Sequence, residues 1–98
     1  MDKMDNNDTI TIKLEGDLVE DNVTKFKDTY MDYLKENIKK FIIDFKDVNY
    51  LSSMGIASIL FLHKKIIDRK GEIELVNLNE KLKKFFIVLE LPKGFIIK

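Results

Sequence analysis

The residues of this sequence that are best placed to take part in a chemical reaction are two adjacent serines. Ser52 and Ser53 follow an apolar segment and open a long apolar stretch with helical spacing. A serine at a helix start ordinarily caps it, because its side-chain oxygen accepts a hydrogen bond from an unsatisfied backbone N–H. Two serines in a row exceed what one cap requires. A phosphate there would meet free N–H groups and the positive end of the helix dipole. It would also add about two negative charges, so a serine at this position can be both a cap and a switch.

His63 is the only histidine, and it lies further along the same stretch. Helical spacing puts it in an apolar stripe that we expect to face a sheet, formed by Ile56, Ile59, Leu60, Ile66 and Ile67. A histidine in such a stripe is more typical of a core residue with one satisfied ring nitrogen than of a catalyst. The chain has no cysteine, no Gly-x-Ser-x-Gly elbow, no glycine-rich phosphate loop and no cluster at metal-ligand spacing. Carboxylate pairs such as Glu72 and Glu74 alternate outward and indicate a solvated face. We therefore expect no enzyme and no bound metal.

The opposite face of the stretch also carries apolar side chains. Met54 and Phe61 fall there, interleaved with Lys64 and Lys65. A methionine and a phenylalanine on an outer face, within two turns of the serine pair, suggest a docking surface. Phe61 could equally pack under a neighbouring loop or helix. The candidate partner-binding residues are Leu51, Ser52, Met54, Gly55, Ala57, Ser58 and Phe61.

Length and charge restrict the classes of function. Ninety-eight residues suit one domain, 1–98, in which residues 1–8 form either a short first strand or a poorly ordered end. The formal net charge is zero and Arg69 is the only arginine, so nothing attracts nucleic acid or an anionic membrane. The longest apolar run, 56–62, is too short to span a bilayer. We expect a soluble, cytoplasmic protein, monomeric or weakly dimeric.

The hydrophobic period switches repeatedly between two and three-to-four residues, which predicts alternating strands and helices. Strands are expected at 9–14, 41–45, 72–76 and 95–97, with 41–45 buried on both faces. Helices are expected from Asp21 to Leu34, from Ser53 to Arg69, and from Asn79 through Leu89, with Asp21 or Asn22 capping the first. This alternation predicts an α/β fold with a mixed or parallel sheet and right-handed crossovers.

The segment 43–56 resembles the central motif of STAS domains, in which a hydrophobic strand leads into Asp/Ser-Ser-x-Gly-Leu. Here that block ends in Leu51-Ser52-Ser53-Met54-Gly55-Ile56. Gly16-Asp17-Leu18 is similar to the family's Gly-Glu-Leu-Asp segment, and the segment 89–95 resembles its Leu-x-Gly-Leu ending. The chain departs from the pattern at Ser52, where the best-known antagonists have aspartate, and at Val19, where the family has the last acid of Gly-Glu-Leu-Asp.

The resemblance implies a small mixed β-sheet whose helices wind as a right-handed β-α superhelix. It further implies a bacterial anti-sigma factor antagonist that binds an anti-sigma serine kinase. A kinase would phosphorylate the antagonist to release it, and a cognate serine phosphatase would restore it. Alignment on Gly55 and Ile56 places Ser53 at the phosphorylated position, with Ser52 as the second choice. ATP would belong to the kinase, so the chain itself would need no cofactor.

Two other classes stay open. The chain could be a non-phosphorylated STAS adaptor of a lipid or anion transport assembly or another signalling assembly, in which the serines are only caps. It could also be a small-ligand sensor with a pocket beside the second helix. Ser52 and Val19 are the residues that leave the partner open.

Overall fold

The computed structural model describes the backbone of residues 2–6 and 8–98 and the side chains of residues 8–98. Five strands form one sheet in the order β1-β2-β3-β4-β5. β1 pairs antiparallel with β2, and the other neighbouring strands pair in parallel. The strands are β1 (Asp2–Asn6), β2 (Thr9–Lys13), β3 (Lys40–Asp44), β4 (Glu72–Val76) and β5 (Phe95–Ile97). β1 lies within the segment 1–8, of which Met1 and Asn7 are outside the described residues.

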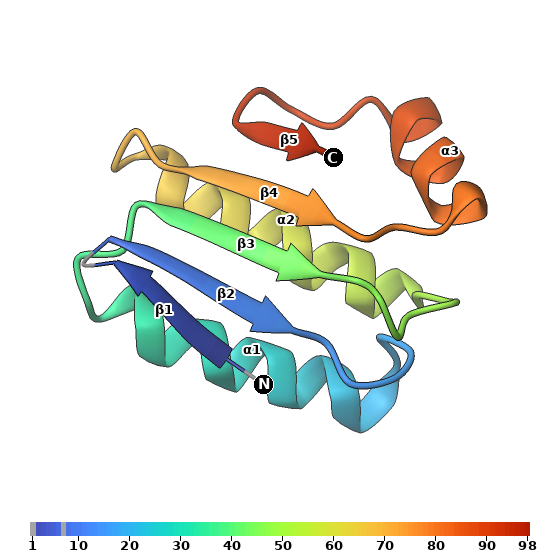
Figure 1. Cartoon of the computed structure of the whole chain (residues 1–98), viewed down its shortest axis with the longest axis horizontal. Coiled ribbons are helices and arrows are strands. Elements are labelled where there is room, and N and C mark those ends of the chain that lie inside the picture. The colour runs from blue at the N-terminus through green and yellow to red at the C-terminus, as the bar shows by residue number, and fades with distance from the viewer. Residues whose placement is uncertain (1, 7) are drawn as a thin grey trace.

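Three helices alternate with the parallel strands: α1 (Glu20–Leu34), α2 (Ser53–Ile67) and α3 (Glu80–Leu89). In Figure 1 the parallel strands run to the right, each later strand lies above the previous one, and α1 and α2 lie behind the sheet. This winding is right-handed, as β-α-β units require. The α/β fold with a mixed sheet and a right-handed β-α superhelix is therefore confirmed.

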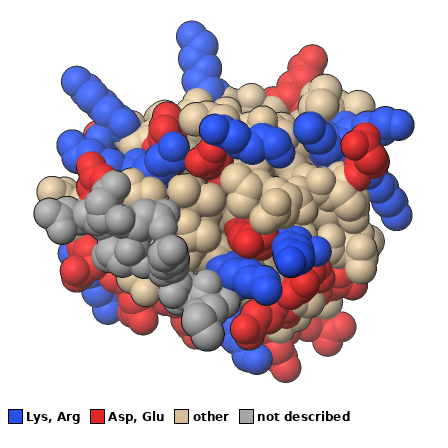
Figure 2. Space-filling model, in the orientation of Figure 1, with Lys and Arg blue, Asp and Glu red and all other residues tan. Residues whose placement is uncertain are grey.

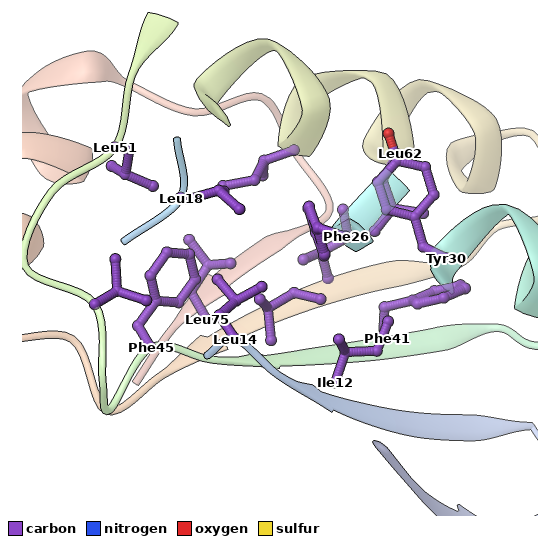
Figure 3. Packing of buried hydrophobic residues seen from close by; sticks show 14 of the residues in the cluster. Ile12, Leu14, Leu18, Phe26, Tyr30, Phe41, Phe45, Leu51, Leu62 and Leu75 are labelled. Atoms are coloured by element: carbon purple, nitrogen blue, oxygen red, sulfur yellow. The ribbon is translucent and has the colours of Figure 1, made fainter. Parts of the chain in front are cut away.

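The core lies between the sheet and the helix layer. Alternate residues of β2 and β3 point into it, because successive side chains of a strand face opposite sides. Figure 3 shows these side chains meeting those of α1 and α2, among them Phe26 and Tyr30. The two rings pack edge to face with centroids 4.9 Å apart. The Tyr30 hydroxyl donates to the Ser58 carbonyl at 2.8 Å, so the core also ties α1 to α2. Burial raises the pKa of Tyr30 to about 12.

Three sequence predictions about burial were wrong. β3 is buried on one face only, and Ile42 and Asp44 are partly exposed on the other. The buried face of α2 is Gly55, Ser58, Ile59, Leu62 and Ile66, whereas Leu60 and Ile67 of the predicted stripe are exposed. The stripe is rotated because α1 covers the side of α2 that carries Ser58. Glu74 is also buried, although we expected a solvated acid.

Glu74 lies on the sheet face opposite the helices, between two lysines. Its carboxylate is 3.3 Å from the Lys40 ammonium on β3 and 3.1 Å from the Lys98 ammonium after β5. Burial opposes ionisation of Glu74, but the hydrogen bonds and charges of Lys98 and Lys40 outweigh it and lower its pKa. The cluster therefore bridges three strands. In Figure 2 basic and acidic side chains lie interspersed with uncharged ones over this face.

Arg69 fastens the end of α1 to the rest of the domain. Its guanidinium donates to the carbonyls of Leu34, Glu36 and Ile38, the last two at 3.1 and 3.2 Å. These carbonyls follow or end α1 and would otherwise need other donors. One planar side chain with five N–H donors satisfies all three, which an ammonium on a single stem cannot do.

Candidate functional site

The candidate site lies at the carboxyl ends of β2 and β3, where both strands lead into helices. The Asp17 carboxylate accepts from the backbone N–H groups of Asn49 and Tyr50, at 2.8 and 3.1 Å. Leu18 donates its N–H to the Tyr50 carbonyl and accepts from the Ser52 N–H, at 3.0 and 3.1 Å. Leu18 and Leu51 thereby form a parallel bridge. The loop after β2 and the loop after β3 form one unit.

Asn22 does not cap α1, and neither does Asp21; this prediction was wrong. Val19 occupies the cap position and provides no side-chain cap. The Asn22 amide instead donates to the carbonyls of Asp17 and Glu15, at 2.8 and 3.3 Å. It therefore stabilises the turn at Gly16, whose φ of 84° lies in the region that glycine adopts freely.

Gly55 lets the start of α2 approach this double loop closely. A Cβ built at Gly55 would lie 2.5 Å from the carbonyl oxygen of Leu18 and 3.1 Å from its Cγ. Every other amino acid would therefore push the helix start away from Leu18. The close contact with Leu18 therefore requires a glycine at position 55.

The two serines have different environments. Ser52 is half-buried and caps α2, because its Oγ accepts from the Gly55 N–H at 3.1 Å. Ser53 is the first residue of α2 and is exposed. Within residues 8–98, no hydrogen bond holds its side chain. Ser52 thus provides the helix cap, and the hydroxyl of Ser53 is exposed to solvent.

A groove of about 440 Å³ runs beside these serines, between the start of α1 and the loop after β3. Its lining is mainly apolar, with Glu20 and Lys27 as the charged members. The lining residues are Val19, Glu20, Val23, Thr24, Lys27, Tyr50, Ser52 and Met54. Glu20 begins α1 with a φ of 44°, a conformation that residues other than glycine adopt uncommonly. A second hollow, of about 550 Å³, lies between α1 and the end of β2.

Six of the seven predicted partner-binding residues divide into two groups, and the seventh, Ser52, is the half-buried cap of α2. Met54, Ala57 and Phe61 are exposed on α2 and form a ridge, since their spacing of three and four residues keeps them on one face. Leu51, Gly55 and Ser58 are buried, so their side chains support the surface and are not part of it. The exposure of Met54 and Phe61 agrees with the prediction made from the sequence. Their contact with a partner stays a prediction.

Phe61 lies between two lysines. The Lys27 and Lys65 ammonium groups are 5.8 and 5.1 Å from the centre of its ring, within the range of cation–π attraction. The ring is thus neither covered by another element nor isolated. The ridge ends in a basic, aromatic cluster, whereas Glu20 makes the other end of the adjoining groove acidic.

His63 lies apart from this site. Its Nε2 is 2.6 Å from the Lys93 carbonyl oxygen, so that nitrogen donates, and its ring stacks on Phe95 with centroids 4.7 Å apart. One ring nitrogen is satisfied, as predicted. The side chain is only partly buried, because it sits between α2 and the edge strand β5, and not in the centre of the core.

Sequence reasoning missed several residues that build the site. Asp17 holds the loop after β3, and Val19, Val23, Lys27 and Tyr50 line the groove. Only the turn residues around Gly16 pointed to Asp17. Among the described residues, no group of three histidines, cysteines or carboxylates could hold a metal. In the same part of the chain, no helix is both long and apolar enough to cross a bilayer.

Comparison with known proteins gives consistent results. The family model described as the STAS domain matches residues 1–97. The fold is similar to the anti-sigma factor antagonist SpoIIAA in its unphosphorylated form, with a TM-score of 0.81, 18% identity, and coverage of 100% of this chain and 86% of that one. It is also similar to the Bacillus cell fate determinant SpoIIAA in the phosphorylated form, with a TM-score of 0.80, 18% identity, and coverage of 100% and 89%. At this identity the likeness shows the fold alone. No curated protein sequence matches the chain.

Proposed function

The chain belongs to the STAS domain family, and from that premise we propose that it is an anti-sigma factor antagonist-like regulator. In this proposal it binds an anti-sigma serine kinase, and phosphorylation of Ser53 switches that binding off. The observation that supports the proposal is the difference in environment between the two serines. Ser52 caps α2 and Ser53 is free and exposed, so a kinase can modify Ser53 without removing the cap.

The docking surface of the proposal is the ridge of Met54, Ala57 and Phe61 together with the groove beside it. Met54 is 65% exposed and also lines the groove, so ridge and groove are continuous. Exposed apolar side chains of this kind, beside Tyr50 at 57% exposure, suit a protein partner. The opposite charges at the ends, Glu20 and the Lys27–Lys65 pair, would fix the orientation of that partner.

Phosphate on Ser53 would act through charge. It would add about two negative charges beside the groove that Ser52, Met54 and Glu20 line. The free N–H groups at the start of α2 accommodate this group, so the helix itself would stay intact. A partner that fits a neutral hydroxyl would then face like or unpaired charge, which costs several kcal/mol. Since each 1.4 kcal/mol is a factor of ten, we expect affinity to fall at least about a hundredfold.

Phosphorylation by an anti-sigma serine kinase that binds the chain tests the acceptor. Intact mass and peptide mapping should find one phosphate, on Ser53. Ser53→Ala should take up none, whereas the matched variant Ser52→Ala should lose stability and still be phosphorylated. Phosphate on another residue, or none from a kinase shown to bind the chain, would refute the assignment.

Calorimetric titration of the same kinase tests the switch. Ser53→Asp and the phosphorylated chain should bind much more weakly than the unmodified chain. Phe61→Ala should weaken binding, and Val88→Ala on α3, which is 80% exposed and lies outside this surface, should leave it unchanged. A neighbouring gene for a transport ATP-binding subunit, together with tight binding that Ser53→Asp does not alter, would favour the adaptor function instead.

A further inference from the structure

α3 is attached to the domain by one face only. Its buried residues are Leu82 and Phe86, and the Phe86 ring packs edge to face on Phe45 with centroids 5.9 Å apart. The Asn79 side chain caps the helix, since it accepts from the Leu82 N–H at 2.8 Å. In Figure 1 the helix lies beyond the carboxyl end of β4, at a corner of the molecule. The face of α3 opposite Leu82 and Phe86 is therefore exposed to solvent.

This exposed face has a basic first half and an apolar second half. Lys81 and Lys84 lie in the first turns, and Ile87 and Val88 lie in the last turn. Steps of three and four residues join these side chains into one face. Ile87 and Val88 are 60% and 80% exposed. Glu90 ends the helix with a φ of 54°, so the chain turns away directly after this apolar turn.

Charge is distributed unevenly over the chain. The net charge is zero, from which the sequence predicted no attraction to an anionic membrane. Residues 80–93, however, contain four lysines and two glutamates, whereas α1 contains two lysines and four acids. Within residues 8–98, none of the four lysines at 81, 83, 84 and 93 forms an ion pair. Because salt screens charges beyond about 8 Å, a surface in contact with α3 meets this local excess and not the net charge of the chain.

We propose that this face of α3 binds the surface of an anionic lipid bilayer. The helix then lies in the plane of the interface, and Ile87 and Val88 enter the boundary between headgroups and acyl chains. Lys81 and Lys84 lay their apolar stems along this boundary and extend their ammonium groups to the lipid phosphates. The contact is adsorption and not insertion across the bilayer. It agrees with the finding that, in the described part of the chain, no helix could span a membrane.

Charge and shape favour a bilayer over other occupants of this face. A second copy packed here would bring its own lysines to the contact, and like charges oppose it. Neither of the two hollows described above is lined by α3, so a protein partner would have to supply a groove for a projecting helix. A fluid bilayer needs no matching shape. Each lysine near an anionic lipid surface contributes about fivefold to affinity, and a buried valine or isoleucine side chain about tenfold.

The position of α3 leaves the candidate functional site accessible. In Figure 1, α1 lies behind the first strands of the sheet and α3 lies beside the last ones. An anionic surface that attracts α3 repels the four acids of α1. The groove that α1 lines therefore faces away from the bilayer, and a regulator held at a membrane through α3 keeps its docking surface open to a partner.

Co-sedimentation of the full chain with lipid vesicles tests the proposal. We expect binding to vesicles of phosphatidylcholine mixed equally with phosphatidylglycerol, and binding at least about tenfold weaker to vesicles of phosphatidylcholine alone. Lys84→Gln should weaken the binding to the anionic vesicles about fivefold. Lys25→Gln, at an exposed position on α1, removes the same charge from the chain and should not weaken it. Circular dichroism confirms that each variant is folded.

Tryptophan fluorescence tests which residues enter the lipid. The chain contains no tryptophan, so Val88→Trp introduces a single reporter at an exposed position of α3. Its emission should shift to the blue when anionic vesicles are added. Met31→Trp, at an exposed position of α1, is the matched control and should show no shift. The proposal would be overturned by absence of binding to the anionic vesicles, by equal binding to both kinds of vesicle, by equal losses in Lys84→Gln and Lys25→Gln, or by equal shifts at positions 31 and 88.

Discussion

Replacement of Gly55 by alanine measures how tightly the start of α2 is held against the loop after β2. The new Cβ would lie 2.5 Å from the Leu18 carbonyl oxygen and 3.1 and 3.3 Å from two of its side-chain carbons. Leu18 cannot easily move, because it is 1% exposed and its N–H and C=O bond Tyr50 and Ser52. The helix start must shift instead, and the hydrogen bond from the Ser52 N–H to Leu18 weakens.

Two effects of opposite sign decide the result. Alanine favours a helix over glycine by at most about 1 kcal/mol. Overpacking ordinarily costs about 1–3 kcal/mol, and a weakened hydrogen bond about 1 kcal/mol more. The clash is with backbone and cannot be relieved by rotating a side chain, so we expect a net loss of about 1–3 kcal/mol. In a domain of this size that lowers Tm by about 5–15 °C.

Urea unfolding followed by circular dichroism, with thermal melting as a second measurement, checks this value. Ser53→Ala is the control, since it changes the same turn of α2 at an exposed position and should stay within about 0.5 kcal/mol of the natural chain. A Gly55→Ala variant as stable as the natural chain, or more stable, would show that the contact with Leu18 is not tight.

The remaining predictions concern the cap, the arginine and the buried acid. Ser52→Ala should lose about 1 kcal/mol in urea unfolding, because the Gly55 N–H loses its acceptor; no change would mean that the cap contributes nothing. Arg69→Lys should lose about 2 kcal/mol in the same assay, since an ammonium cannot reach all three carbonyls after α1. Glu74 has a lowered pKa in the folded protein. Its contribution is therefore fully present above its ordinary pKa of 4.5 and is lost as the pH falls through the lowered value. Unfolding measured against pH should show this loss in the natural chain and a flatter profile in Glu74→Gln; identical profiles would contradict it.

Periodicity in the sequence predicted the elements well, because each strand and helix keeps its own apolar spacing. The strands at 72–76 and 95–97 and the start of α2 at Ser53 are where the pattern put them. Burial across elements was less predictable. The stripe of α2 was assigned from α2 alone, but α1 reaches it through Tyr30 and covers Ser58. Glu74 alternates like a solvated residue, and only the sheet brings Lys40 and Lys98 to it.

The part of the candidate site that lies within one segment could be predicted from the sequence, whereas the contacts between distant segments could not. The serine pair, Gly55, Met54 and Phe61 belong to one continuous segment, and their pattern indicated a helix start with an apolar outer face. Asp17 is more than thirty residues away from the amides that it binds, so no local pattern could reveal the contact. Arg69 stood out as the only arginine, yet its position beyond α2 gave no sign that its partners are the carbonyls at the end of α1.

The double loop has a consequence for the speed of recognition. Asp17 and Leu18 hold Asn49, Tyr50 and Ser52 by four hydrogen bonds, two to the Asp17 carboxylate and two to the backbone of Leu18. A surface that is already ordered loses little conformational entropy when a partner arrives, so encounter need not wait for a loop to fold. Because these bonds hold the loops in place, we expect a charge added at Ser53 to leave the shape of the surface unchanged and to alter only the electric field around it. The amides of these residues should exchange with solvent deuterium slowly, and at the same rate whether or not Ser53 carries a phosphate.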